Sequence, residues 1–326
     1  MKVVNRKSFW LSVAIKVTVF VVLILALYKQ VYLNESVHQI PDQLFALQPM
    51  FVVPVLLLLM IGMVLNWGLE AAKWHLVMQK LTPLRFVRAY KAVLTGVTLG
   101  LFTPNRVGEF GGRILYVPRK FRISAAIVSL IGSFSQNLVT VAAGMLGACS
   151  YLLQKEEISV PLVLVVMLLG AIAVVLLLLA YYNLDVVVAL FKNNRYLKRV
   201  YSYTTVLQSY GQRDLSALLL LAFLRYAVYT AQYLIFLNLF GAGLELMDGL
   251  AAITVIFLAQ TVVPSFAIAD LLTRLPVAAL ILTEYGVPVQ VSLAATTSIW
   301  ILNLIIPAVF GYFFIIRYNI FKNRQS

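Results

Sequence analysis

The chain has 326 residues, of which 62% are hydrophobic and 12% charged, and its net charge at pH 7 is +14. Soluble domains are near half apolar and about a quarter charged, so this composition excludes an ordinary soluble protein. Repeated apolar stretches of roughly 20 residues instead predict an all-α polytopic membrane protein. In that class a basic excess indicates a positive-inside bias and affinity for anionic head groups, so no nucleic-acid partner is expected.

Apolar segments follow one another along the whole chain. They lie at 9–28, 50–69, 87–103, 123–153, 159–182, 214–240, 245–263, 265–283 and 288–316. The first follows a basic start and precedes KQVYLNES, which offers no small-residue cleavage site. It is therefore interpreted as an uncleaved span rather than a signal peptide. No segment is typical of a soluble domain, so residues 1–326 are predicted to form a single membrane domain.

Two of these regions do not fit a full span. Segment 87–103 is short and runs into the charged, glycine-rich stretch TPNRVGEFGGR (103–113). Segment 245–283 is interrupted at Pro264 and carries Asp270 and Arg274. Proline disrupts a helix, and broken backbone at membrane depth persists only where protein or a wet cavity shields it. The prediction is two broken, re-entrant helical hairpins and six full spans.

The loop charges predict the orientation. With the N-terminus in the cytoplasm, the inside loops and tail hold Lys73, Lys80, Arg85, Arg88, Lys91, Arg119, Lys120, Arg122, Lys192, Arg195, Lys198, Arg199, Arg213, Arg317, Lys322 and Arg324. The outside loops hold Glu35, Asp42, Glu156, Glu157, Glu245, Asp248 and Glu284, and only Lys29 and Lys155 break the pattern. This separation favours an even number of spans, an N-in/C-in topology and a multi-pass location in the cell (inner, cytoplasmic) membrane.

An internal repeat is also predicted. The unit of span, hairpin and span occurs at about 50–153 and again at about 214–316, with 159–182 inverting the second unit. Inverted repeats with broken helices that meet at mid-bilayer are a recurring transporter design. The mixed apolar, aromatic and basic segment 184–211 is interpreted as an interfacial helix on the cytoplasmic surface, either as a lipid anchor or as a docking site for a partner.

The hairpins carry the main candidate site. Glu109 and Arg113 in the first hairpin, like Asp270 and Arg274 in the second, have i, i+4 spacing and share a helical face. One interpretation is that each pair merely neutralises itself and fixes its hairpin. The other is that the arginines bind phosphate, since guanidinium groups suit phosphate oxygens.

The second interpretation depends on Arg106, which has no evident acidic neighbour in its hairpin, so the hairpin has a positive surplus. Thr103 is expected to cap a helix in which Pro104 occupies the first position, and a helix N-terminus attracts phosphate. Asn105 lies between these residues and Arg106 and is included among the head-group contacts. The predicted ligand is an anionic lipid or lipid-linked phosphate.

Weaker candidates lie on the spans. Gln136 and Asn137 either line a polar path or hydrogen-bond between helices. Arg225 either faces the cavity or pairs with an acid. Asn303, Gln260 and Trp67 are interpreted as packing or interface residues.

The sequence gives little support for an enzymatic function. Cys149 is the only cysteine, and His38 and His75 are far apart, so neither a disulfide nor a metal site is expected. No G-x-x-x-x-G-K-[ST] loop is present, so ATP binding is not expected. The sequence predicts no cofactor and no catalytic residue.

Three blocks resemble a known family: NWGLEAAKWHLVMQKL (66–81), TPNRVGEFGGR (103–113), and the later proline–acid block PSFAIAD (264–270). Together they resemble the flippase-like membrane region of lysylphosphatidylglycerol synthases, which is also found as a stand-alone integral membrane protein. The most specific part is P-x-R-x-G-E at Pro104, Arg106, Gly108 and Glu109, whereas SFAIAD lacks the corresponding glycines. The resemblance implies a two-half translocase for a phospholipid or lipid-linked intermediate. The chain ends with IIRYNIFKNRQS, without the synthase domain of the multidomain relatives, so aminoacyl transfer is not expected.

Three functions follow as hypotheses. The first is a lipid translocase in which Arg106, Arg113 and Arg274 hold the phosphate. The second is an enzyme acting on a lipid phosphate, and the third is a non-transporting scaffold for a lipid-modifying or glycan-assembly enzyme. A second copy of the chain or such an enzyme are the partners left open, and the sequence does not name the lipid, the direction or the energy source.

Overall fold

The computed structural model describes residues 49–103, 106–155, 158–193, 204–262 and 270–317, and the regular elements in these ranges are all helical. Five long, apolar stretches have the length and composition to cross a membrane. They are α3 (Pro49–Gln79), α6 (Arg122–Leu153), α7 (Val160–Tyr182), α10 (Gln212–Leu239) and the continuous run of α13 (Val289–Trp300), the π-helical turn η4 (Ile301–Ile305) and α14 (Ile306–Arg317). The protein is therefore an all-α, multi-pass membrane protein. The predicted span 9–28 lies outside the described residues.

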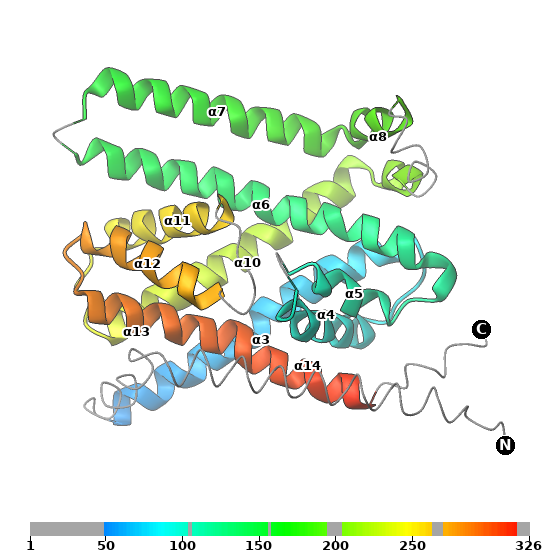
Figure 1. Ribbon diagram of the computed structural model, residues 1–326, viewed down its shortest axis with the longest axis horizontal. Helices are drawn as coiled ribbons and strands as arrows, with labels where there is room; N and C mark the ends of the chain where they lie inside the picture. Colours follow the sequence, from blue (N-terminus) through cyan, green and yellow to red (C-terminus); the bar gives the residue numbers. More distant parts are fainter. Residues whose placement is uncertain (1–48, 104–105, 156–157, 194–203, 263–269, 318–326) are drawn as a thin grey trace.

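Two pairs of short helices lie between the long ones. The first pair is α4 (Phe86–Gly100) and α5 (Gly108–Ile114), and the second is α11 (Leu246–Val262) and α12 (Asp270–Thr283). At about 1.5 Å per residue, α4 is roughly 22 Å long and α5 roughly 10 Å, shorter than a hydrocarbon core of about 30 Å. Figure 1 shows the first pair toward one end of the bundle and the second toward the other.

The first pair is a tight antiparallel hairpin. A Cβ added to Gly112 would lie 2.5 Å from the Gly96 Cα, and one added to Gly108 would lie 2.2 Å from the Leu99 carbonyl oxygen. The residues in contact therefore follow opposite orders in the two helices, which makes the helices antiparallel. Both helices carry a G-x-x-x-G spacing, Gly96 with Gly100 and Gly108 with Gly112, which lets helix backbones approach closely in a membrane.

The element order of long helix, short pair and long helix occurs on both sides of α7. We call each of these sets of helices a unit: α3 to α6 is the first and α10 to α14 the second. The packing pattern stays the same when the two units are exchanged, since α4 packs on α14, α11 packs on α6, and α3 packs on α10. Small residues allow both crossed contacts, since a Cβ on Gly311 of α14 would lie 2.0 Å from the Leu94 carbonyl oxygen and one on Gly147 of α6 would lie 1.9 Å from the Thr254 hydroxyl. Each short pair thus rests on the last long helix of the other unit.

Helix α3 is longer than its hydropathy predicts. The predicted span ended at residue 69, whereas α3 continues to Gln79. Lys73 was therefore wrongly assigned to a cytoplasmic loop: it lies inside the helix and is 2% exposed. Its ammonium is neutralised by Glu70, three residues earlier on the same helix, and it also donates to the Gly132 carbonyl oxygen and to Gln136 of α6. A hydropathy window detects neither kind of partner.

The described part of segment 184–211 contains a helix, α8 (Leu184–Asn193), and a 3₁₀ turn, η2 (Thr205–Ser209). Leu184 and Val188 of α8 are buried. After η2, the Tyr210 hydroxyl donates to the Val77 carbonyl oxygen at 2.6 Å. This contact fixes the end of the segment to the end of α3.

Candidate functional site

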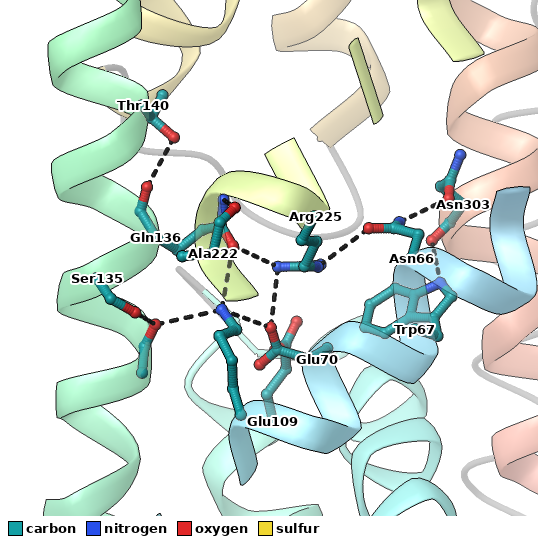
Figure 2. Close-up of polar contacts among 12 residues, drawn as sticks. Asn66, Trp67, Glu70, Glu109, Ser135, Gln136, Thr140, Ala222, Arg225 and Asn303 are labelled. Carbon is teal, nitrogen blue, oxygen red and sulfur yellow. Dashed lines mark hydrogen bonds and ion pairs between the residues drawn. The ribbon is translucent and has the colours of Figure 1, made fainter. Parts of the chain in front are cut away.

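A buried carboxylate lies at the centre of the polar cluster in Figure 2. Glu70 of α3 is 6% exposed. Its Oε2 lies 2.8 Å from Lys73 Nζ and 3.0 Å from Arg225 Nη1, and its Oε1 lies 2.8 Å from Arg113 Nη2. A single charge at the bilayer centre costs roughly 2.5–3.5 kcal/mol on insertion scales. Mutual neutralisation by groups from α3, α5 and α10 offsets that cost.

The cluster continues into the first hairpin. Arg113 Nη2 also lies 3.3 Å from Glu109 Oε2, which confirms the predicted i, i+4 pair. Arg106 Nε lies 3.6 Å from Glu109 Oε1, so the prediction that Arg106 has no acidic neighbour was wrong. The positive surplus holds nevertheless. Among the residues that the structure describes, the cluster has four cations (Lys73, Arg106, Arg113 and Arg225) and two carboxylates, Glu70 and Glu109.

A chain of amides extends from Arg225 to the second unit. Arg225 Nε donates to Asn66 Oδ1 at 3.1 Å, and Asn66 Nδ2 donates to Asn303 Oδ1 at 2.8 Å. Asn303 Nδ2 then donates to Gln232 Oε1 at 3.0 Å. Asn303 lies in the π-helical turn, and its backbone carbonyl accepts a bond from Trp67 Nε1 at 3.1 Å. Single π-helical turns of this kind often occur at functional sites.

Gln136 of α6 joins the two parts of the cluster. Its Oε1 accepts bonds from Lys73 Nζ at 3.0 Å and from Arg225 Nη1 at 3.3 Å. Asn137, the next residue, is exposed and does not line the cavity described next. The structure therefore separates two residues that the sequence placed on one polar path, because successive helix positions point about 100° apart.

A cavity of about 200 Å³ adjoins this cluster. It is lined by Asn66, Trp67, Arg106, Gln136, Thr140, Arg225, Tyr226, Tyr229, Phe257, Gln260, Thr261, Arg274, Trp300, Asn303 and Leu304. Its cationic groups come from the first hairpin (Arg106), from α10 (Arg225) and from the second hairpin (Arg274). None of the described side chains that line it is acidic. Arg274 Nη1 donates to Gln260 Oε1 at 2.8 Å, which links α12 to α11.

The other predicted site residues are only partly brought together. Glu109 and Arg113 lie in the charged cluster without lining the cavity. Asn105 and the side chain of Asp270 lie outside the described part of the structure. Thr103 does not begin a helix at Pro104, since α5 begins at Gly108. Instead, the Thr103 hydroxyl accepts a bond from the Gly108 amide at 2.6 Å.

The predicted helix start was wrong for a backbone reason. Arg106 has φ of 57°, in the left-handed region. This conformation costs a non-glycine residue roughly 1–2 kcal/mol and cannot continue a right-handed helix. Strain of this kind tends to cluster at functional sites, and Arg106 lines the cavity.

Sequence reasoning missed Asn66, Glu70 and Lys73 as site residues. Their spacing of four and three residues on an otherwise apolar helix places them on one face, and that pattern could have revealed them. Trp67, Gln260 and Asn303 were interpreted as packing residues, yet all three line the cavity. The signal for the amides was their position inside apolar spans, where an unpartnered polar group is costly.

Comparison with known proteins supplies one match. The family model described as "Lysylphosphatidylglycerol synthase TM region" matches residues 13–311, which is most of the chain. No curated protein and no solved structure gives a significant match.

Proposed function

Since the chain belongs to the family of the lysylphosphatidylglycerol synthase TM region, we propose that it moves an anionic phospholipid or lipid-linked phosphate between the leaflets of the cytoplasmic membrane. The head group occupies the cavity between the two hairpins while the acyl chains stay in the bilayer. The lipid is moved without chemical change.

The observation that carries this proposal is the charge of the cavity. Arg106, Arg225 and Arg274 line it, and no described lining residue is acidic. Guanidinium groups present paired donors that match phosphate oxygens. At about 30 Å³ per water molecule, the cavity has room for roughly seven waters. That is enough for a head group but not for lipid tails.

The arrangement of the hairpins supports movement across the membrane. Arg106 belongs to the connection between α4 and α5, and Arg274 lies in the first turns of α12, so cationic groups of both hairpins line one cavity. We interpret the pairs as re-entrant hairpins from opposite faces, with α4–α5 on the cytoplasmic side and α11–α12 on the outer side. The exchange-symmetric packing favours an inverted repeat, a design that gives alternating access around a fixed site.

The ion pairs at the site have two different roles. The Glu70 pairs with Arg113 and Arg225 are short, at 2.8 and 3.0 Å, and the Glu70 side chain is only 8% exposed, so they hold the site together. The contact between Arg106 and Glu109 is longer, at 3.6 Å, and the Arg106 side chain is 31% exposed. Arg106 is therefore the group that exchanges a carboxylate for a lipid phosphate. A membrane potential with a negative interior favours outward movement of an anionic head group by about 2.3 kcal/mol per charge per 100 mV.

Reconstitution in liposomes tests the proposal. A fluorescent phosphatidylglycerol is placed in both leaflets, and a membrane-impermeant quencher reports how much becomes accessible from outside. We expect accessibility to rise with the wild-type protein and to fall to the protein-free level with Arg106→Gln. Arg119→Gln removes an exposed arginine of η1 (Arg119–Phe121) that is remote from the cavity, so it should behave as wild type.

The alternatives give different results in the same assay. A scaffold for a lipid-modifying enzyme would move no lipid in any variant. An enzyme acting on the lipid phosphate would leave a product of altered mass in the lipid extract. Either result would overturn the proposed function.

A further inference from the structure

The cavity has a second, uncharged half whose composition indicates what is attached to the phosphate. Besides the arginines, its lining is rich in aromatic and amide side chains. The aromatic ones are Trp67, Tyr226, Tyr229, Phe257 and Trp300, and the amides are Asn66, Gln136, Gln260 and Asn303. A site for a bare phosphate would need neither group. The following inference rests on the proposed function and narrows its substrate.

The aromatic rings form one wall around Phe257. Its ring centroid lies 5.6 Å from that of Tyr226 and 5.2 Å from that of Tyr229, in edge and tilted arrangements. Trp67 is already covered by the Arg225 guanidinium, 5.1 Å from its ring centroid. Phe257 and Tyr226 are each 8% exposed and line the cavity together with Tyr229, so parts of these rings form an apolar side on which the C–H face of a sugar or other saturated ring can pack.

Hydrogen-bonding groups are available beside this wall. Gln260 Oε1 accepts a bond from Arg274, while its Nε2 has no partner among the described residues. Gln260 lines the cavity. A ligand hydroxyl can accept from its Nε2, so a hydroxylated ligand would use a donor that has no partner in the described residues.

Charge disfavours the head groups that carry an amine. An ammonium group in the cavity would face Arg106, Arg225 and Arg274, with no acidic side chain among the described lining residues. Repulsion between like charges strongly weakens the binding of a ligand that carries an ammonium group. Head groups that carry an amine, whether ethanolamine or an attached amino acid, are therefore disfavoured.

We propose that the head group is a phosphate bearing an uncharged polyhydroxylated ring, such as a sugar. The arginines bind the phosphate, the rings around Phe257 pack on the ring face, and Gln260 donates to one of its hydroxyls. The cavity of about 200 Å³ admits one such ring with its phosphate.

The test uses fluorescent lipids with identical chains in the liposome assay. Phosphatidylinositol carries a neutral polyhydroxylated ring, phosphatidic acid carries none, and phosphatidylethanolamine carries an amine. We expect phosphatidylinositol to move at least about tenfold faster than phosphatidic acid, with phosphatidylethanolamine slowest. If no lipid moves, the proposed function fails. If lipids move but phosphatidic acid or phosphatidylethanolamine equals or exceeds phosphatidylinositol, the function stands and this inference is wrong.

Two variants locate the preference in the cavity. Tyr229→Leu removes part of the aromatic wall, and Gln260→Leu removes the amide donor. Each should bring the ratio of the phosphatidylinositol rate to the phosphatidic acid rate down toward one. Phe310→Leu changes an aromatic residue of α14 that is 51% exposed, and it should keep the full preference. An unchanged preference in both cavity variants, with folding verified by thermal melting, would overturn the assignment.

Discussion

The Glu70 carboxylate and the Arg225 guanidinium lie 3.0 Å apart (Oε2 to Nη1), and they come from α3 and α10, the first long helices of the two units. The same carboxylate binds Arg113 of the first hairpin. One buried anion therefore joins both units and a hairpin at the side of the cavity. This arrangement explains how several cations can be buried near the centre of an apolar bundle.

Replacing this anion should destabilise the protein strongly. Glu70→Gln leaves Lys73, Arg113 and Arg225 without their shared counter-charge, and breaking a buried ion pair costs about 3–5 kcal/mol. We expect a large fall in the thermal midpoint of the detergent-solubilised protein. Asp214→Asn provides the control, because its pair with Lys80 (3.0 Å) is partly exposed and such pairs contribute little. Equal effects of both changes would contradict the central role of Glu70.

The close approach of α4 and α5 predicts a contrast between neighbouring glycines. A Cβ at position 112 would lie 2.5 Å from the Gly96 Cα, whereas a Cβ at position 111 has no atom within 4 Å. Gly112→Ala must push the two backbones apart and should cost a few kcal/mol, in the range of about 1–3 kcal/mol for overpacking. Gly111→Ala should be neutral or slightly stabilising. Thermal melting of both variants checks this, and similar midpoints would show that the hairpin is packed differently.

The left-handed conformation of Arg106 separates the role of its backbone from that of its side chain. Glycine adopts φ of 57° freely, whereas alanine bears a cost of about 1–2 kcal/mol. We expect Arg106→Gly to melt at a higher temperature than Arg106→Ala, while both lose lipid movement. Transport that survives in the glycine variant would show that the guanidinium is dispensable.

The hydrogen-bonded amides Asn66, Asn303 and Gln232 predict that a single apolar substitution lowers the stability of the protein. Asn303→Leu removes the partner of both Asn66 and Gln232, and a buried polar group left unsatisfied costs about 1–3 kcal/mol. We expect a lower melting temperature and slower lipid movement, because Asn66 also positions Arg225. Asn238→Leu, on an exposed position of α10, should change neither quantity. A neutral Asn303→Leu would refute the structural role of the chain.

Hydropathy alone located most of the long helices. The spans predicted at 123–153 and 159–182 correspond to α6 (Arg122–Leu153) and α7 (Val160–Tyr182). These predictions succeed because the hydrocarbon core is the solvent and sets both the composition and the length of a span. The i, i+4 pair of Glu109 and Arg113 was predictable for a similar reason, since helical spacing alone brings the two side chains together.

Contacts between distant segments were not predictable in this way. Lys73 was assigned to a loop because α3 continues to Gln79, beyond its most apolar part. Its ion-pair partner Glu70 lies three residues away on α3, whereas Gln136 and Arg225 join the pair only when α6 and α10 pack on α3. The role of Asn303 depends on a π-helical turn that no sequence pattern announced. Spacing within one helical turn revealed the pair of Glu109 and Arg113 but not that of Glu70 and Lys73. The hydrogen bond that joins Asn66 to Asn303 across helices was missed as well.

The contact between Gly96 and Gly112 also limits how the protein can move. With no side chains between them, the two backbones act as a single stiff body, and separating them would open a gap that lipid cannot fill. Under the proposed function, a conformational change that admits a head group would carry α4 and α5 together. It would move α4 along α14, where the Thr98 hydroxyl donates to the Ala308 carbonyl oxygen at 2.7 Å. This contact, rather than the turn at the hairpin tip, would then limit the rate of that change.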